Sequence, residues 1–325
     1  MSLFRRPTAY VAATIVLFLS GCSAATVAQS PSNPAAPAAV EMDNCGTMIS
    51  FAAPPERIVA VKSSSLELLL ALGASEKIVG AAFLDGPLPD SLADQGAKVP
   101  ILSERLPSRE AVLEVEPDLI FAGWESNFSS DGVGERTSLE KLGVGTYVAP
   151  AACTALGYKP DPLTFDHVFD GFVELGEIID EGQAAKALVD EQAAELAAIV
   201  PDKRNLSTVW YSSGKDQPFV GAGLGAPEMI MSAAGLNNVF ADVDDSWAST
   251  SWESVAQANP DVIVLVDATW NTAAAKVDLL QANPVTAHLD AVRMNRYIIV
   301  DFPATEAGVR SVDAVTAIVD QLSSL

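Results

Sequence analysis

The sequence has few basic residues. Nineteen lysines and arginines stand against 42 aspartates and glutamates, and the formal net charge is −23. Binding to nucleic acid depends on basic side chains that release counterions from phosphates. The shortage of such side chains excludes a general nucleic-acid-binding protein.

Histidine and cysteine are also scarce. His167 and His288 are the only histidines and cannot supply a site of three imidazoles, and the three cysteines are too far apart for a zinc ribbon or most iron–sulfur clusters. The serine-hydrolase motif Gly-x-Ser-x-Gly is missing, and the glycines at 221–225 lack dinucleotide-binding spacing. We therefore expect no catalytic residue, no metal site and no resident cofactor.

The first 21 residues have the pattern of an export signal. Arg5 and Arg6 precede an apolar stretch at 9–19 that is too short for a permanent membrane helix. It ends in Leu19-Ser20-Gly21-Cys22, the pattern of a bacterial lipobox. We expect 1–21 to be a lipoprotein signal peptide and Cys22 to carry a diacylglyceryl group. The alternative is an ordinary cleaved signal with an incidental cysteine.

Residues 22–42 are predicted to be a lipid-anchored flexible tether, because 23–39 are rich in Ala, Ser, Pro and Thr and have no apolar periodicity. Without the signal, 17 basic and 42 acidic residues leave a net charge of −25. We expect the exported body to be held at the outer face of the cell membrane by lipid rather than by charge.

Two cysteines remain once Cys22 is assigned to lipid. Cys45 opens the folded region, and Cys153 follows a predicted strand near the end of the first lobe. Exported proteins form disulfides readily, so we predict a Cys45–Cys153 bond. The alternative is two buried free thiols.

The full chain of 325 residues is 49% hydrophobic and is long enough for two ordinary domains. Strand patterns alternate with helix patterns, which indicates parallel sheets covered by helices. We expect an N-terminal α/β lobe at 43–162, a connecting helix at 163–181 and a C-terminal α/β lobe at 182–325. Expected strands lie at 57–61, 77–80, 119–122, 145–148, 208–211, 262–266 and 297–300, and expected helices at 66–72, 108–116, 137–142, 227–234, 254–258 and 311–322.

An internal repeat relates the two lobes. Residues 109–120 match residues 252–263 with a constant offset of 143, and both copies contain Glu-x₆-Pro-Asp. Each copy predicts a short helix, a Pro-Asp stop and a buried strand. Two lobes of one plan with a helix between them favour a clamp that holds a ligand in a cleft.

Four stretches that follow a lipobox in this order make the sequence similar to the substrate-binding lipoproteins of ABC importers for iron–siderophore chelates, cobalamin and haem. The resemblance covers 43–325 and implies two α/β lobes joined by a single long helix, with the ligand cleft between them. It also implies an ABC permease with a cytoplasmic ATPase as partner, and we expect a monomer. The stretches are 55–59 with 65–68 and 71–73, the two Glu-x₆-Pro-Asp copies, and 225–228 with 234–239.

A narrower resemblance concerns the ligand. The chain resembles an actinobacterial branch of that family, which is assigned to uptake of a deazaflavin cofactor precursor. The family resemblance therefore leaves that precursor, ferric siderophores, corrinoids and haem as ligands. The matching stretches are 43–46, 121–127, 150–153, 210–214 and 266–271.

Glu110 and Glu253 occupy the same place in the two copies of the repeat. In the family, the glutamate at this place in each lobe meets an arginine pocket on the permease, so the resemblance implies permease docking through charge-assisted pairs. The alternative is that both carboxylates only complement helix dipoles.

Two basic residues are expected at the cleft. Lys62, with Ser63 and Ser65, lies between a strand and a helix N-terminus, where a phosphate or carboxylate could sit. The alternative is a helix N-cap by one serine. Arg310 follows the last strand. Because bases are so scarce, Lys62 and Arg310 predict a ligand that carries negative charge.

Tryptophans in or beside predicted loops suit stacking on a ringed ligand. We expect at least two of Trp124, Trp247, Trp252 and Trp270 to line the cleft. Further ligand-binding candidates are Asn127, Tyr211, Ser213 and Asn271. Tyr211 is also the candidate axial ligand should the cargo be haem.

The leading hypothesis is a binding protein that delivers a bulky metal-chelate or ringed cofactor-type ligand to an ABC importer. The alternative is a cell-surface enzyme, such as a metal-assisted hydrolase, which needs a cluster of titratable groups in the cleft. A third hypothesis is a sensor or adhesion module without a transport role.

Overall fold

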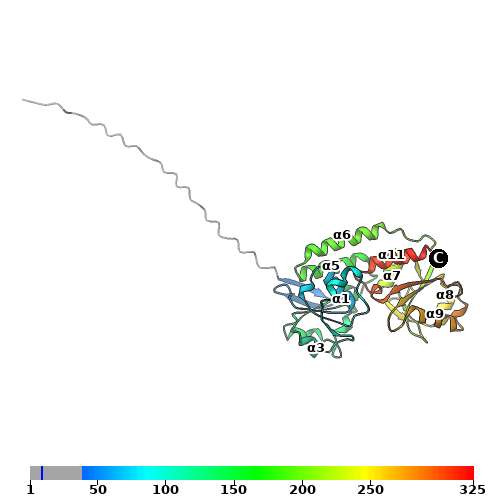
Figure 1. Cartoon of the computed structure of the whole chain (residues 1–325), viewed down its shortest axis with the longest axis horizontal. Helices are drawn as coiled ribbons and strands as arrows, with labels where there is room; N and C mark the ends of the chain where they lie inside the picture. The colour runs from blue at the N-terminus through cyan, green and yellow to red at the C-terminus, as the bar shows by residue number, and fades with distance from the viewer. Residues whose placement is uncertain (1–8, 10–38) are drawn as a thin grey trace, which may run out of the picture. The chain divides into compact units, whose positions relative to one another are not determined.

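A computed structural model describes residue 9 and residues 39–325, and the latter belong to one unit of the chain (Figure 1). The expected signal peptide, Cys22 and most of the expected tether lie outside the described residues. In the described part, no helix combines the length and the apolar character needed to span a membrane.

A β-hairpin that the sequence analysis missed begins the described segment. β1 (Val40–Asn44) pairs antiparallel with β2 (Thr47–Phe51) through a turn at Cys45 and Gly46, whose φ angles are 52° and 77°. Two-residue turns with positive φ match the twist of paired strands. The expectation of a flexible tether is therefore wrong for residues 40–42, which belong to β1.

The first lobe contains a parallel sheet of five strands in the order β5-β4-β3-β6-β7. The inner strands β3 and β6 are buried along their whole length, as continuous apolar runs covered on both faces should be. The elements are β3 (Ile58–Val61), α1 (Ser63–Ala71), β4 (Ile78–Ala82), α2 (Asp90–Gly96), β5 (Ile101–Ser103), α3 (Arg109–Leu113), β6 (Leu119–Ala122), α4 (Arg136–Glu140) and β7 (Gly145–Val148), with short 3₁₀ turns at Ser75–Lys77, Glu125–Asn127 and Pro150–Ala152.

The second lobe differs from the expected parallel sheet, because its order β11-β9-β8-β12-β13 is mixed. β8, β12 and β13 are parallel, whereas β9 is antiparallel to β8 and β11 is antiparallel to β9. Gly214, with φ 88°, permits the chain reversal after β8. The elements are β8 (Ser207–Ser213), β9 (Phe219–Gly221), α7 (Ala226–Ala234), β10 (Asn237–Asn238), β11 (Trp247–Ser249), α8 (Trp252–Ala258), β12 (Val262–Asp267), α9 (Ala273–Ala282), α10 (Asp290–Arg293), β13 (Tyr297–Asp301) and α11 (Ser311–Leu322), with 3₁₀ turns at Thr286–His288 and Phe302–Thr305.

The internal repeat has the same structural role in both lobes. The Asp118 carboxylate accepts hydrogen bonds from the amides of Glu56 and Arg57 at 2.8 and 2.9 Å. The Asp261 carboxylate accepts from the amide and hydroxyl of Ser207 at 2.9 and 2.7 Å. Each aspartate thus fixes the chain at the start of the neighbouring inner strand, β3 or β8.

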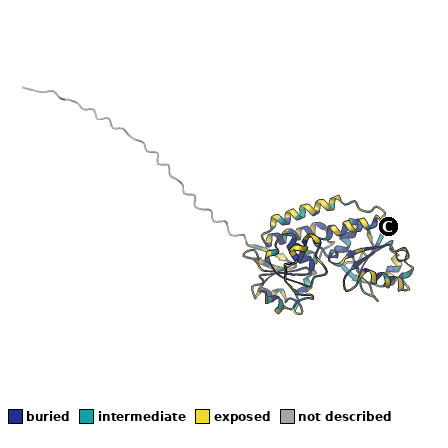
Figure 2. Cartoon of the chain, viewed as in Figure 1, coloured by how far each residue is buried: buried dark blue, intermediate teal, exposed yellow. Residues whose placement is uncertain are grey.

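Two helices lie between the lobes in sequence. α5 (Phe165–Ile178) corresponds to the expected connecting helix, and α6 (Gly182–Ala198) packs along it and extends over both lobes (Figure 1). Burial is divided between the two helices: α6 is exposed along most of its length, whereas the inner face of α5 is buried (Figure 2).

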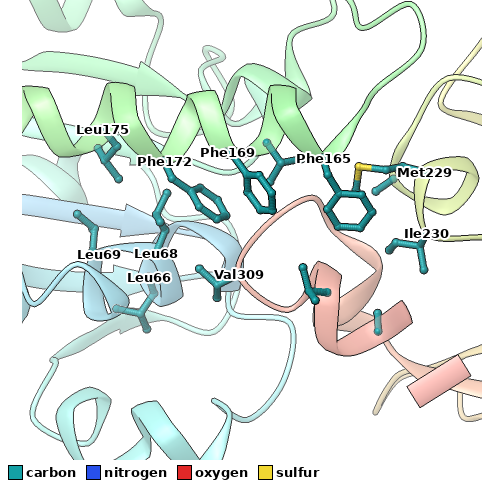
Figure 3. Packing of buried hydrophobic residues seen from close by; sticks show 14 of the residues in the cluster. Leu66, Leu68, Leu69, Phe165, Phe169, Phe172, Leu175, Met229, Ile230 and Val309 are labelled. Carbon is teal, nitrogen blue, oxygen red and sulfur yellow. The ribbon is translucent and has the colours of Figure 1, made fainter. Parts of the chain in front are cut away.

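The inner face of α5 joins the cores of the two lobes. Phe165, Phe169 and Phe172 form a row, in which neighbouring ring centroids are 6.0 Å apart. One end of this row packs over the leucines of α1 and the other lies beside Met229 and Ile230 of α7 (Figure 3). One continuous apolar cluster therefore runs from the first lobe into the second.

Candidate ligand-binding site

A cavity of about 420 Å³ lies between the two lobes. The first lobe contributes residues 123–126, 149 and 151–154, which follow β6 and β7. The second lobe contributes the end of β8, residues of β9 and β11, and residues that follow β12 and β13. Ligands of open α/β sheets bind outside the carboxyl ends of parallel strands, so the fold places this cavity where binding is expected.

Aromatic side chains form much of the cavity wall. Trp247 and Phe219 are stacked, with centroids 5.7 Å apart and planes at 13°, and Trp270 meets Phe302 edge-on at 5.7 Å. Trp124 lines the first lobe's side. Trp270 is 60% exposed and Phe219 37% exposed, so both offer apolar surface to an incoming ligand.

Glu306 fixes Trp124 from the opposite lobe. The indole Nε1 of Trp124 donates a hydrogen bond to Oε2 of Glu306 at 2.6 Å. Burial raises the pKa of the Glu306 carboxyl, while the charge of Lys62 and the Trp124 hydrogen bond act in the opposite direction. Both Trp124 and Glu306 line the cavity.

Lys62 lies behind the wall and does not line the cavity, which corrects its assignment as a ligand contact. Its side chain is fully buried, and its ammonium pairs with Asp85 and lies 3.6 Å from the ring centroid of Trp124. The Ser63 hydroxyl accepts a hydrogen bond from the Asp85 amide at 2.8 Å. Ser65 is buried as well. The expected phosphate or carboxylate site does not form, because Lys62 is buried and paired with Asp85. The alternative, an N-cap by a serine, does not form either, because α1 begins without a side-chain cap.

Arg310 is also engaged within the protein. Its Nη2 and Nε donate to the Glu67 carboxylate at 2.6 and 2.8 Å, and Nη2 also donates to the Pro87 carbonyl at 2.6 Å. Burial raises the pKa of Glu67, and Arg310 acts in the opposite direction. This bidentate pair joins the lobes, and Arg310 does not line the cavity.

Three other candidates support the wall without reaching the cavity. The Asn127 carboxamide accepts from the Trp124 amide at 3.3 Å, and the Asn271 carbonyl accepts from the buried Lys276 ammonium at 2.6 Å. Tyr211 is buried and donates to the Gly214 carbonyl at 2.6 Å, and burial raises its pKa to about 12. Tyr211 therefore cannot be an axial ligand for a haem in this cavity.

The structure thus brings Trp124, Trp247, Trp270 and Ser213 together at the cavity. Trp252 is instead buried in the second lobe. Glu125, Phe219 and Phe302 also line the cavity and were not predicted from the sequence. The sequence did contain a signal for Phe302, namely an aromatic residue just after a predicted strand. Phe302 directly follows β13, as Trp124 and Trp270 come shortly after β6 and β12.

Cys45 and Cys153 are joined by a disulfide, as the sequence predicts, with Cα atoms 5.2 Å apart. Cys153 lines the cavity and begins a rim segment, residues 153–163, that reaches the second lobe. In this segment the Leu163 amide donates to the Leu224 carbonyl at 2.9 Å. The disulfide therefore anchors one rim of the cavity.

A family model for periplasmic binding proteins matches residues 58–304. The chain belongs to the periplasmic binding protein family. The match covers both sheets, α5 and most of the cavity lining.

Three relatives show the range of the family around this chain. A periplasmic binding protein of Veillonella parvula is 26% identical, with a TM-score of 0.78 over 88% of this chain and 98% of that one. An ABC-type Fe³⁺-hydroxamate transport system structure from Saccharomonospora viridis is 25% identical, with a TM-score of 0.73 over 87% and 98%. A cobalamin-binding protein of Halobacterium salinarum is 27% identical over 238 residues, which are 69% of this chain and 57% of that protein, so this chain spans little more than half of that relative.

In this periplasmic binding protein, Glu110 and Glu253 have equivalent surroundings. Each is exposed at the second position of its short helix, α3 or α8. The preceding Ser108 and Ser251 hydroxyls cap the two helices by accepting amide hydrogen bonds at 3.3 and 3.1 Å. The Glu110 carboxylate also forms an exposed ion pair with Arg109 at 3.4 Å, whereas among the described residues no ion pair within 4 Å involves Glu253.

Proposed function

We propose that this protein is the substrate-binding component of an ABC importer, which captures a bulky, ring-bearing or metal-chelate ligand and delivers it to a permease. The aromatic cavity between the lobes carries this proposal, because its indole and phenyl surfaces suit a large ligand with apolar rings. Membership of the periplasmic binding protein family supports it.

For the ligand we propose a corrinoid or a ferric hydroxamate. Two of the three named relatives are a cobalamin-binding protein and a structure from an Fe³⁺-hydroxamate transport system, and in both kinds of ligand the metal is held by the ligand's own donors. Haem commonly takes an axial His, Tyr, Met or Cys from the protein. Among the described lining residues the single such side chain is Cys153, which is disulfide-bonded. The names of these three relatives give no support to the deazaflavin precursor.

The alternative of a metal-assisted hydrolase finds little support in the cavity. Its titratable lining groups are Glu125 and Glu306, and among the described residues no group of three or more His, Cys, Asp or Glu side chains is placed to hold a metal. Hydrolysis of this kind needs both a metal site and an activated nucleophile.

Binding is tested by titrating the purified protein with cyanocobalamin and with ferrioxamine B while tryptophan fluorescence is recorded. We expect saturable quenching by at least one of them and no chemical change in the ligand, because Trp124, Trp247 and Trp270 line the cavity. Turnover of a bound compound would instead revive the enzyme hypothesis, and absence of binding by both would contradict the proposed ligand class.

We further propose that Glu110 and Glu253 dock the permease. Uptake of the bound ligand by cells should fall at least about tenfold in a Glu110→Ala/Glu253→Ala variant, because two charge-assisted pairs are lost. Ligand binding by the purified variant should persist. The matched control is Glu191→Ala/Glu195→Ala, which removes two exposed carboxylates of α6. Uptake that survives the first double substitution would contradict the docking role.

The proposed site of action is the outer face of the cell membrane, with Cys22 as the lipid-bearing residue and 1–21 as its signal peptide. A Cys22→Ala variant should appear in the soluble fraction, whereas the wild-type chain should remain with membranes. Equal partition of both chains would contradict the anchor.

A further inference from the structure

The charged groups that face the cavity are all acidic. Its lining includes the carboxylates of Glu125 and Glu306, and none of its described lining residues is a lysine, an arginine or a histidine. A ligand in this cavity therefore meets two carboxylates and several aromatic faces without a basic side chain.

The bases behind the wall do not compensate for this charge. Lys62 pairs with Asp85, and Arg310 forms its bidentate pair with Glu67. Glu306 is a third carboxylate and lies close to Lys62 and Asp85, and it is the member of this group that lines the cavity. In their ionised forms the three carboxylates outnumber the two bases by one. Burial raises the pKa of Glu306, while the charge of Lys62 and the hydrogen bond from Trp124 favour its ionised form.

Glu125 lies on the first lobe's side of the cavity. Its Oε2 accepts hydrogen bonds from the amide and hydroxyl of Thr154, each at 2.6 Å. Arg136 interacts with Glu125 through its charge, but its guanidinium donates to Asn44 and Thr146. Within the described residues Glu125 forms no ion pair shorter than 4 Å, so its carboxylate charge is uncompensated by direct contact.

The aromatic wall has the same electrostatic sign. The faces of indole and phenyl rings carry partial negative charge and attract cations. The ammonium of Lys62 already lies against one face of Trp124, and the exposed rings of Trp270 and Phe219 remain for a ligand. Carboxylates and ring faces together form a surface that attracts positive charge and repels anions.

We propose that the cavity selects ligands that carry positive charge, with Glu306 as the specificity-determining residue and Glu125 in a supporting role. This inference rests on the proposed function and narrows its ligand class to cationic chelates and cationic ring-bearing compounds. It reverses the expectation of an anionic ligand, because the two bases on which that expectation depended are paired inside the protein.

Two pairs of compounds matched in shape and different in charge test the inference. Ferrioxamine B is a ferric trihydroxamate with a pendant ammonium, and its N-acetyl derivative is the same chelate without that charge. Aquacobalamin is a cation at neutral pH, and cyanocobalamin is uncharged. Each is titrated into the full chain while tryptophan fluorescence is recorded. We expect the cationic member of a pair to bind about tenfold more tightly at low salt, with a smaller ratio at about 0.5 M salt.

The role of Glu306 is tested with Glu306→Gln, which removes the charge and keeps an oxygen to accept from Trp124. The ratio of the two affinities within a pair should shrink to about twofold or less in this variant. The matched control is Glu191→Gln on α6, which removes the charge of an exposed residue that does not line the cavity. The control should keep the wild-type ratio.

The outcomes separate this inference from the proposed function. Equal or tighter binding of the uncharged member would overturn the charge selection and leave the binding function standing. A cation preference that persists in Glu306→Gln would overturn the assignment to that residue. Failure of all four compounds to bind folded protein would overturn both the proposed ligand class and the inference.

Discussion

Lys62 combines a strained backbone, a buried charge and contact with the ligand wall. Its φ of 86° and ψ of 155° fall in a region that is almost confined to glycine and costs on the order of 1–3 kcal/mol. The surrounding structure holds it there: its amide donates to the Ala82 carbonyl at 3.0 Å, and its ammonium pairs with Asp85 beneath Trp124. Lys62 is therefore a positioning residue of the cavity wall.

Lys62→Met should destabilise the protein by about 3 kcal/mol, because removing one partner leaves the Asp85 carboxylate buried without its counter-charge. Urea unfolding followed by far-UV circular dichroism measures this change. Lys186→Met is the control, since Lys186 forms an exposed pair with Asp190 that contributes at most about 0.5 kcal/mol. Equal effects of the two substitutions would contradict the proposed burial of the Lys62 charge.

The buried Lys276 should make the free energy of unfolding depend on pH. It is buried, and its ammonium donates to the carbonyls of Val266 and Asn271 at 2.5 and 2.6 Å, which holds the turn that presents Trp270. Burial lowers its pKa from 10.5 to about 8. Between those values the unfolded chain binds a proton that the folded chain lacks, so the free energy of unfolding should rise with pH.

The measurement compares the wild type with Lys276→Met by urea unfolding at several pH values from about 7 to 10. The difference between the two proteins isolates the titration of this one amine. A difference that stays constant over the range would show that the folded-state pKa is not lowered.

The sequence could indicate that Lys62 lies beside the cleft but not what its charge does. Its partner Asp85 is 23 residues away, and the partner of Arg310, Glu67, is 243 residues away. The first pairing depends on how β3 and the loop after β4 are arranged within one lobe, and the second on how the two lobes meet, and local patterns encode neither. Trp124 and Trp270 were predictable because both closely follow apolar strands whose carboxyl ends must meet at one edge.

At the scale of elements, strong periodicity was predictive and short elements were not. The final helix is found at Ser311–Leu322, with the predicted bounds, and the buried strand after the second Pro-Asp is β12. The edge strand β5 and the antiparallel strands β9 and β11 have three residues each, too few for a recognisable alternation. Their pairing partners, rather than their own residues, make them strands.

The β1–β2 hairpin is attached to the first lobe by a side chain and by a disulfide. The Asn44 carboxamide donates to the Val148 carbonyl and accepts from the Val148 amide, both at 2.9 Å, as a neighbouring strand would. The adjacent Cys45 is bonded to Cys153, which begins the rim segment. Hairpin, β7 and cavity rim thus form one supported unit.

Cys45→Ser/Cys153→Ser should lower the free energy of unfolding by about 2–5 kcal/mol, because the bond closes a loop between residues 108 positions apart. Urea unfolding of wild type and variant, both without reductant, gives the value. Adding a thiol reductant should bring the wild type to the stability of the variant. A reductant effect that is absent, or a double variant as stable as wild type, would contradict the bond.

The two lobes share one apolar core at the scale of the whole molecule. Phe169 lies in the middle of the α5 row, between the leucines of α1 and the side of α7, and it is 6% exposed (Figure 3). Two further links join the lobes, the Arg310–Glu67 pair and the Trp124–Glu306 hydrogen bond. We expect both lobes to unfold together.

Phe169→Ala should cost about 3–5 kcal/mol through lost burial and a cavity between the lobes. Differential scanning calorimetry should show one transition for the wild type and a lower or broadened one for the variant. Val173→Ala on the exposed side of α5 is the control and should change little, since Val173 is 36% exposed. Two separated transitions in the wild type would contradict a shared core.

The apolar core under α5 also affects the kinetics of capture. Wide separation of the lobes would expose the row of phenylalanines to water, so the resting protein spends little time in a widely open form. A ligand must therefore enter through the mouth that already exists, past the exposed ring of Trp270. Association should follow the frequency of encounter, without a slow conformational step before it. If the proposed docking to a permease is correct, that partner has to supply the energy for release, because the shared apolar cluster opposes separation of the lobes in the described part of the chain.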